Sequence, residues 1–266
     1  MDDVTRTDKM LSRKDGNVGY VIFNNPERHN AVSLDMWAAT SDILESFRND
    51  PDVRVVVVTG AGGKAFVSGA DISKFESERS SEDAVKRYNE TVAKANLSVY
   101  TYPKPTIAMI QGYCIGGGLG LALCCDLRIA SDNSKFGVPA AKLGLGYAYH
   151  GLKRLVDVVG PAFAKEVFYT GRQFDAAEAL EMGLINRAVP AAELETYVKG
   201  YADTIAGNAP LTLKSVKFIV GETVKDESQR DLAQADELVQ ACFKSQDYIE
   251  GRRAFMEKRK PKFTGT

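Results

Sequence analysis

Two glycine-rich loops follow apolar, strand-like runs, and they are the first places where this chain could do chemistry. The first loop, residues 60–65 (GAGGKA), matches the spacing G-x-G-x-x-[GA]. A dinucleotide-binding loop also needs a helix that begins there and an acidic residue about 20 positions later. Residues 66–71 continue instead as another loop, and Ala65 stands where a P-loop requires Ser or Thr. The spacing therefore does not favour a phosphate-binding loop.

The second loop, residues 112–120, holds five glycines just before a short apolar segment. Both loops place small residues, Ala70 in one and Gly116 to Gly118 in the other, ahead of a predicted helix. Exposed N–H groups at a helix N-terminus stabilise a developing oxyanion, because their partial charge is fixed before the reaction begins. Two such groups that converge would form an oxyanion hole. The spacing alone equally allows that the glycines only permit close strand–helix packing.

The remaining reactive side chains predict neither a metal site nor a covalent nucleophile. Cys114, Cys124, Cys125 and Cys242 lack C-x-x-C spacing, and the chain has two histidines, His29 and His150. Buried thiols in a reducing cytosol are the simplest interpretation. Ser68 lies in the segment 66–71 and Cys114 in the second loop, both near the presumed site. The sequence shows no His–acid pair that could activate either side chain as a nucleophile.

Composition limits the class of protein further. The 266 residues suit one large domain, or one domain with a smaller appendage. A formal net charge of -1 gives no broad basic face, so nucleic acid is not an expected partner. The apolar runs are far shorter than the ~20 residues of a membrane span, and the N-terminus is polar and acidic rather than signal-like. We therefore expect a cytoplasmic protein without a membrane segment.

The elements that must position these loops follow from periodicity and turn signals. Residues 9–13 and 18–23 predict a hairpin closed at Asp15-Gly16, and Ser33 predicts the cap of a helix that ends at residues 49–51. An unbroken run of four valines, residues 55–58, predicts a strand buried on both faces. Further predictions are a helix over 81–100, a strand over 106–111 and a short buried helix over 121–125. After residue 160 strand signals almost vanish, which indicates an α/β core of about 150 residues followed by helices, the last over 249–260.

The chain resembles the crotonase superfamily, the enoyl-CoA hydratase/isomerase family, through motifs spread over nearly its whole length. The first group of motifs is NNPERHNA at residues 24–31, VVVVTG at 55–60, KAFVSGAD at 64–71 and KP at 104–105. The second group is GYCIGGG at 112–118, CDLRIA at 125–130, KFG at 135–137, TGR at 170–172, AEA at 177–179 and GL at 183–184. Their order and spacing make the resemblance highly specific.

The resemblance implies the fold, the oligomer and the ligand. The expected fold class is α/β, a crotonase-type spiral of ββα units over residues 1–200, with a C-terminal helical trimerisation region over 201–266. The implied assembly is a homotrimer or a dimer of trimers. The implied oxyanion hole is the backbone N–H of Ala70 and Gly117, which would hold the thioester carbonyl of an acyl-CoA. Coenzyme A would enter as part of the substrate, with no prosthetic group. The implied coenzyme A contacts are Arg28, His29, Lys64, Ala70, Asp71, Ile72, Gly116, Gly117, Phe255 and Lys258, the last two from the tail of the same or a neighbouring subunit.

Two positions depart from the hydratase pattern. Hydratases of the family use one glutamate two residues after the triple glycine and another directly after the Pro that follows the Phe-Gly pair. These positions hold Gly120 and Ala140 in this chain. A general acid or base needs a titratable group within hydrogen-bond reach, which neither residue supplies. The sequence therefore disfavours ordinary hydration of an enoyl-CoA.

A third departure supplies other polar groups. Where relatives have small residues, residues 144–151 read GLGYAYHG. Ala148 replaces the Asp of dienoyl-CoA isomerases, while Tyr147 aligns with a tyrosine of a methylmalonyl-CoA decarboxylase. Tyr147, Tyr149 and His150 are the remaining candidates for acid, base or hydrogen-bond donor. Alternatively, the rings fill space or face solvent.

We therefore expect an acyl-CoA lyase or isomerase of this family, with Ala70, Gly117, Tyr147 and His150 at the catalytic site. Decarboxylation of a malonyl-type thioester needs only enolate stabilisation and one proton donor, so it tolerates the loss of both carboxylates. Hydrolysis or C–C cleavage that uses His150 is a second alternative. A third is a catalytically inactive subunit that binds coenzyme A. The acyl group depends on residues 74–87 and the tail, so the sequence leaves it open.

Overall fold

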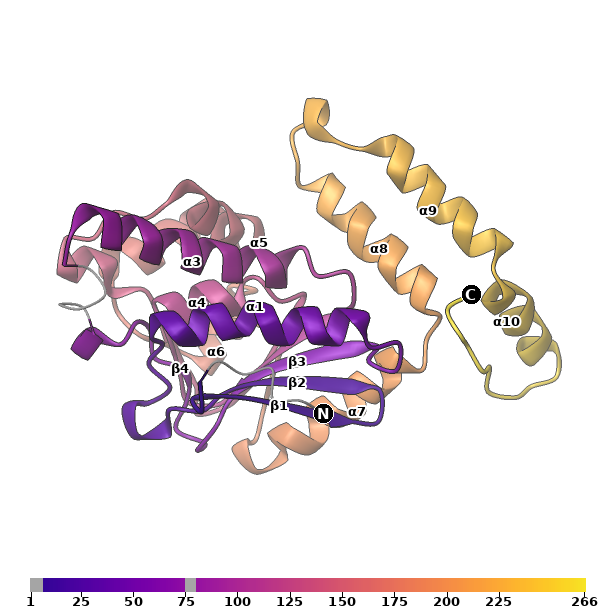
Figure 1. The fold of residues 1–266 in the computed structure, drawn as a ribbon, viewed down its shortest axis with the longest axis horizontal. Helices are drawn as coiled ribbons and strands as arrows, with labels where there is room; N and C mark the ends of the chain where they lie inside the picture. The colour runs from indigo at the N-terminus through magenta and orange to yellow at the C-terminus, as the bar shows by residue number, and fades with distance from the viewer. Residues whose placement is uncertain (1–6, 75–79) are drawn as a thin grey trace.

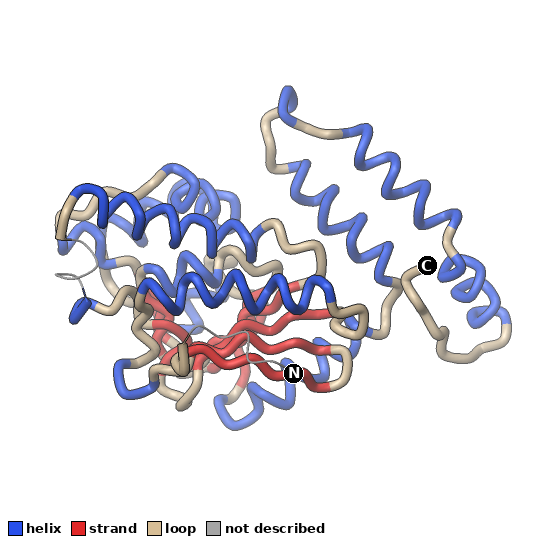
Figure 2. The backbone as a smooth tube through the Cα atoms, in the orientation of Figure 1, coloured by secondary structure: helices blue, strands red, loops and turns tan. Residues whose placement is uncertain are grey.

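A computed structural model describes residues 7–74 and 80–266 of the chain, and its strands form two sheets (Figure 2). The larger sheet contains β1 (Met10–Asp15), β2 (Val18–Phe23), β3 (Val55–Gly60), β5 (Thr106–Ile110), β7 (Leu127–Ser131) and β10 (Arg187–Val189), in the order β1-β2-β3-β5-β7-β10. The smaller sheet contains β4 (Ala65–Val67), β6 (Tyr113–Ile115), β8 (Lys135–Gly137) and β9 (Phe174–Asp175), in the order β4-β6-β8-β9. β1 with β2 and β8 with β9 are antiparallel, and the other neighbours run parallel.

Helices cover both faces of the larger sheet (Figure 1). The α-helices of the described residues are α1 (Leu34–Asn49), α3 (Glu82–Tyr100), α4 (Gly117–Ala122), α5 (Tyr149–Thr170), α6 (Ala176–Glu181), α7 (Leu194–Ala206), α8 (Pro210–Thr223), α9 (Leu232–Lys244) and α10 (Gln246–Met256). The same residues also form the short 3-10 helices η1 (Pro26–Arg28), η2 (Ile72–Lys74), η3 (Pro139–Leu143), η4 (Ala191–Glu193) and η5 (Glu227–Gln229).

The four valines of β3 confirm a strand buried on both faces. Val56 and Val58 belong to the core that α1 and α3 cover, while Val55 and Val57 belong to the core beneath α7. Successive side chains of a strand point to opposite faces, so a run of apolar residues can serve two cores at once. β3 therefore anchors the loop that follows it from both sides.

Several helix starts agree with the sequence, and two local predictions are wrong. Ser33 is the N-cap residue of α1, as predicted, although its hydroxyl donates to the Asp35 carboxylate instead of accepting from a backbone N–H. α4 begins at Gly117, four residues before the predicted start. Strands also continue beyond residue 160, because β10 adds to the larger sheet beside β7 and β9 adds to the smaller one.

The last three helices stand apart from the sheets (Figure 1). Arg54 ties the tail to the core by donating to the carbonyl oxygens of Ala206, at 3.2 Å, and Phe263, at 2.7 Å. Residue 200, where we expected the core to end, lies within α7, whose residues Val198 and Ala202 are buried against the larger sheet. The packed α/β layers thus run to the end of α7, and the role of the region beyond it stays a prediction.

Candidate active site

The two loops singled out in the sequence lie against each other. β4 and β6 are parallel neighbours, so the chain leaves both strands at the same edge of the smaller sheet. A Cβ placed on Gly69 would lie 3.4 Å from the carbonyl oxygen of Ile115. One placed on Gly118 would lie 2.1 Å from the carbonyl oxygen of Val67, which is too close for any side chain. Gly118 therefore permits close packing of α4 on β4, which is the alternative role that the sequence allowed for these glycines.

The backbone on either side of Ala70 is fixed by Val32, two residues before α1. Val32 donates its N–H to the Gly69 carbonyl at 2.9 Å, and its carbonyl accepts the Asp71 N–H at 3.0 Å. This parallel bridge pairs Val32 with the carbonyl of Gly69 and the N–H of Asp71, so the N–H of Ala70 takes no part in it. The first of the two predicted donors is thus held at a defined place.

The second predicted donor begins a helix. Gly116 has φ 57°, a left-handed value that favours glycine, and its N–H donates to the Gly137 carbonyl at 2.8 Å. Gly117 is the first residue of α4, so its N–H has no acceptor within the helix. The amides of Ala70 and Gly117, which have no hydrogen-bond acceptor among the described residues, therefore follow two adjacent strands at one edge.

Tyr147 occupies the space beside Gly120. Its hydroxyl oxygen lies 3.8 Å from the position that a Cβ on Gly120 would take. A Cβ on Gly151 would lie 3.0 Å from Cε1 of the same ring, and the Phe168 ring meets it edge-on at 4.8 Å between centroids. Two glycines and one aromatic ring thus fit around Tyr147, and its hydroxyl lies beside Gly120, one of the two positions that depart from the pattern expected from the sequence.

The surroundings of the Tyr147 hydroxyl favour its neutral form. Burial of the hydroxyl raises the pKa of Tyr147 above its ordinary value, and the neighbouring Cys124 acts in the same direction. Burial also raises the pKa of Cys124 to about 11, partly offset by Arg154, whose Nη1 lies 3.3 Å from the sulfur. Near pH 7 the Tyr147 phenol and the Cys124 thiol are therefore both neutral, and such groups donate protons more readily than they remove them.

The other positions that the sequence singled out, Ala140, Tyr149 and His150, bring no polar side-chain atom next to Gly120. Ala140 is 4% exposed within η3 and brings no polar side-chain group. His150, the second residue of α5, is exposed and lies beside the exposed ring of Tyr149, 5.6 Å between centroids. Of the three candidates, Tyr147 is the one whose polar atom lies next to Gly120.

Comparison with known proteins decides the family. The family model described as Enoyl-CoA hydratase/isomerase matches residues 13–266. The chain belongs to the enoyl-CoA hydratase/isomerase family. Crotonyl-CoA hydratase of Syntrophomonas wolfei is 33% identical over 256 residues, 96% of this chain and 98% of that protein. Short-chain-enoyl-CoA hydratase of Clostridium acetobutylicum is 34% identical over 251 residues, 94% and 95% of the two chains.

Solved structures agree with this assignment. An enoyl-CoA hydratase/carnithine racemase from Magnetospirillum magneticum superposes with a TM-score of 0.93 at 38% identity, over 98% of this chain and 97% of that one. A protein of the enoyl-CoA hydratase/isomerase family from Hyphomonas neptunium gives a TM-score of 0.92 at 36% identity, over 98% and 100%. The predicted crotonase-type α/β fold is confirmed.

The family positions expected to contact coenzyme A on the core differ in exposure. Lys64 and His29 are exposed, and His29 lies 5.8 Å from the Tyr113 ring. Arg28 is half-exposed, and its Nη1 lies 3.5 Å from Oδ1 of Asp71. Asp71 itself is 3% exposed, and its Oδ1 also accepts from the backbone N–H and hydroxyl of Ser73. Asp71 therefore braces this loop, and Ile72 follows it as the start of η2.

The two family positions expected on the tail lie far from these loops in the same chain (Figure 1). Phe255 is near the end of α10 and is 84% exposed, and Lys258 follows the helix in a left-handed conformation. Both belong to the part of the chain that stands away from the sheets. They are thus not brought to the core loops of their own chain.

Trp37 is a neighbour of the site that the sequence did not single out as functional. Its Cζ2 atom lies 3.6 Å from the position that a Cβ on Gly117 would take. At helical spacing in an apolar pattern, Trp37 looked like any other core residue of α1, and nothing local links residue 37 to residue 117.

Two further observations concern only the described ranges, 7–74 and 80–266. No helix there is long and apolar enough to cross a membrane. No group of three or more His, Cys, Asp or Glu side chains there is arranged to hold a metal ion. Of the segment expected to shape the acyl pocket, residues 75–79 lie outside the described part.

Proposed function

We propose that this family member acts on an acyl-CoA thioester and stabilises an enolate or oxyanion through the N–H groups of Ala70 and Gly117. The adjacent free amides support this proposal, because preorganised donors lower the energy of negative charge that develops on the thioester oxygen. The relatives named as hydratases of crotonyl-CoA and short-chain enoyl-CoA support the ligand class. Coenzyme A would be bound with the substrate.

The reaction that best suits the remaining groups is decarboxylation of a malonyl-type thioester, and the observation that carries this choice is the Tyr147 hydroxyl beside Gly120. Water addition requires a base to activate water, but a phenol with a raised pKa is a poor base at neutral pH. In decarboxylation the bond from the α-carbon to the carboxylate breaks, CO2 leaves, and the electron pair forms the thioester enolate. Tyr147 would then give its proton to the α-carbon and regain one from water.

A panel of thioesters tests the proposal. We expect malonyl-CoA or methylmalonyl-CoA to be turned over, and crotonyl-CoA to be hydrated at least about a hundredfold more slowly than by a relative with both glutamates. Product formation can be followed by chromatography of the CoA esters. Hydration of crotonyl-CoA at the rate of such a relative would show the decarboxylase proposal to be wrong. Binding of CoA esters with no turnover would favour the inactive-subunit alternative.

Within that assay, Y147F separates the candidate proton donors. It keeps the ring between Gly151 and Phe168 but removes the hydroxyl, so we expect kcat to fall about a hundredfold. The wild-type rate should stay level from neutral pH and fall only above about pH 10, since the raised pKa keeps Tyr147 protonated below that value. H150A is the matched control, and a large loss in H150A with none in Y147F would support the hydrolase alternative instead.

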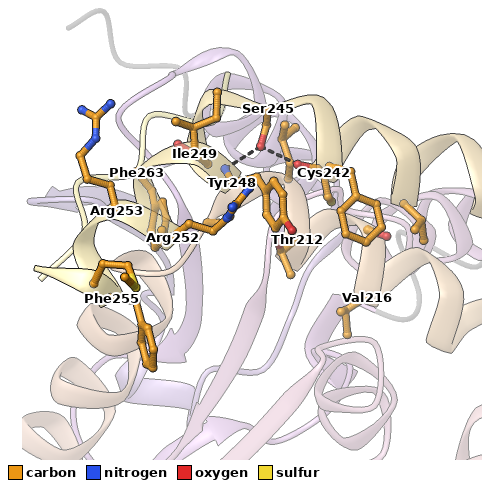
Figure 3. A pocket seen from close by; sticks show the side chains of 18 of the residues that line it. Thr212, Val216, Cys242, Ser245, Tyr248, Ile249, Arg252, Arg253, Phe255 and Phe263 are labelled. Carbon is orange, nitrogen blue, oxygen red and sulfur yellow. Dashed lines mark hydrogen bonds between the residues drawn. The ribbon is translucent and has the colours of Figure 1, made fainter. Parts of the chain in front are cut away.

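We also propose that the chain assembles as a trimer or a dimer of trimers through its C-terminal helices. These helices enclose an apolar groove of about 1210 Å³, and Figure 3 shows Val216 of α8 with Tyr248 and Phe255 of α10 around it. Phe255 and its neighbour Met256 are 84% and 81% exposed, and monomers rarely leave such large apolar patches uncovered. Assembly would also let Phe255 and Lys258 reach coenzyme A bound to a neighbouring subunit.

Light scattering on the purified protein tests this assembly. We expect a mass three or six times the 29.0 kDa of one chain, and a lower mass for V216D, which places a charge in the groove. A wild-type mass of 29.0 kDa at micromolar concentration would contradict the proposed assembly.

A further inference from the structure

The start of α1 and the residues just before it border both halves of the proposed oxyanion hole. Just before α1 begins, the backbone of Val32 pairs with the residues on either side of Ala70. One turn into α1, the ring of Trp37 lies on the side of Gly117 where a side chain would be. The separation of the two N–H donors therefore depends on the short stretch of chain from Val32 to Trp37.

Trp37 is suited to hold Gly117 by shape. Its side chain is 1% exposed, and the Phe23 ring meets it edge-on at 6.2 Å between centroids. Cζ2 belongs to the outer, six-membered part of the indole, and a Cβ added to Gly117 would be in ordinary van der Waals contact with it at 3.6 Å. The indole edge therefore borders the space beside this peptide at about the distance of one methyl group, and it limits how far Gly117 can move toward α1.

The polar atom of Trp37 does not explain its presence. The indole Nε1 is buried and has no hydrogen-bond partner among the described residues. A buried donor without a partner carries a desolvation cost that Phe or Leu would avoid. A smaller apolar residue would lack the outer ring of the indole, and the Cζ2 atom of that ring is the one that lies beside Gly117.

We propose that Trp37 is a positioning residue for the oxyanion hole: its indole edge sets the place of the Gly117 N–H relative to the Ala70 N–H. The inference rests on the proposed acyl-CoA function and adds the residue that gives the hole its geometry. A donor displaced by a fraction of an ångström weakens transition-state stabilisation more than ground-state binding. Loss of the indole should therefore lower kcat and leave KM nearly unchanged.

The sharpest test replaces Trp37 by Phe, whose ring still packs on Phe23 but does not reach Gly117. F47L is the matched control, since Phe47 is also a buried ring of α1 but contacts β2 at Gly19. The probe is 4-dimethylaminocinnamoyl-CoA, whose absorption moves to longer wavelength when hydrogen bonds polarise its carbonyl. This optical shift reports on the oxyanion hole whether or not the substrate is known.

We expect the wild type and F47L to shift the probe equally, and W37F to shift it by less than half as much. For the malonyl-type substrate we expect W37F to lower kcat about 10- to 100-fold, with KM changed less than about twofold. W37L, which removes the ring entirely, should show a larger effect of the same kind. An equal optical shift and equal kcat in W37F and F47L would overturn the inference. A wild type that binds the probe without any shift would overturn the proposed oxyanion hole, and the positioning role with it.

Discussion

Replacing Gly117 by proline is expected to lower kcat/KM for acyl-CoA turnover by about 10²- to 10³-fold, the usual cost of removing one oxyanion-hole donor. Proline has no backbone N–H, so the substitution deletes the donor that we assign to this position. The Ala70 donor and the coenzyme A contacts remain in place. Affinity for coenzyme A alone should therefore change little.

The local structure is expected to accept this change. Gly117 is the first residue of α4, the helix position at which proline is best tolerated because its missing N–H has no intrahelical acceptor. A Cβ here meets Trp37 at 3.6 Å, which is an ordinary contact. Gly116 keeps the conformational freedom of glycine next to the new proline.

The comparison variant is G117A, which adds the same Cβ but keeps the N–H. We expect it to lose less than about tenfold in kcat/KM, so the difference between the two variants measures the donor. Circular dichroism and binding of coenzyme A would show that both are folded. Equal losses in G117P and G117A would mean that crowding at this position, rather than the N–H, limits the reaction.

Elements with strong local signals could be predicted from the sequence. Asp15-Gly16 between two alternating runs predicted the β1–β2 hairpin, and four consecutive valines predicted a strand with two buried faces. Asp175 and Ser245 are residues typical of helix starts, and both cap their helices, α6 and α10, through side-chain oxygens. Pro161 begins the second half of α5 directly after a kink at Gly160. These features depend on neighbours within a few residues, which a single sequence displays.

Elements that depend on distant partners were missed or misplaced. Glycine is a poor helix former, so α4 was expected only after its glycines, yet Gly118 is needed where the backbone of α4 approaches Val67. β10 has three residues and exists because β7 offers a parallel edge. Both elements depend on contacts with segments that lie more than 50 residues away in the chain. A local sequence pattern does not predict such contacts.

The site shows the same division. Ala70, Gly117 and Tyr147 could be proposed from motifs, and the lack of a carboxylate at Gly120 was evident from one residue type. The packing of Tyr147 between Gly151 and Phe168 could not be predicted, since it depends on how the 144–148 loop folds onto α4. The place of the Tyr147 hydroxyl beside Gly120 separates Tyr147 from His150, and that place is a property of the folded chain.

Restoring the two missing carboxylates is expected to convert the chain into a hydratase. The variant combines G120E and A140E with Y147A, and we expect crotonyl-CoA hydration to rise about 10³-fold over the wild type. The two glutamates would supply the base that positions water and the acid that protonates the α-carbon. Y147A is included because the Tyr147 hydroxyl lies 3.8 Å from the place that the Cβ of the new residue would take, so the phenol borders the space into which a glutamate would extend.

The matched control carries G120Q and A140Q in the same Y147A background. Glutamine has the size and hydrogen-bonding groups of glutamate but cannot accept or release the proton, so hydration should stay at the wild-type level. The reaction is followed by the loss of enoyl-thioester absorbance, and binding of the cinnamoyl probe shows that the site is intact. If the glutamate variant binds the probe but hydrates no faster than the glutamine variant, the absent carboxylates are not what prevents hydration. The positions of water and acyl group, set by the 144–148 loop, would then be the limiting difference.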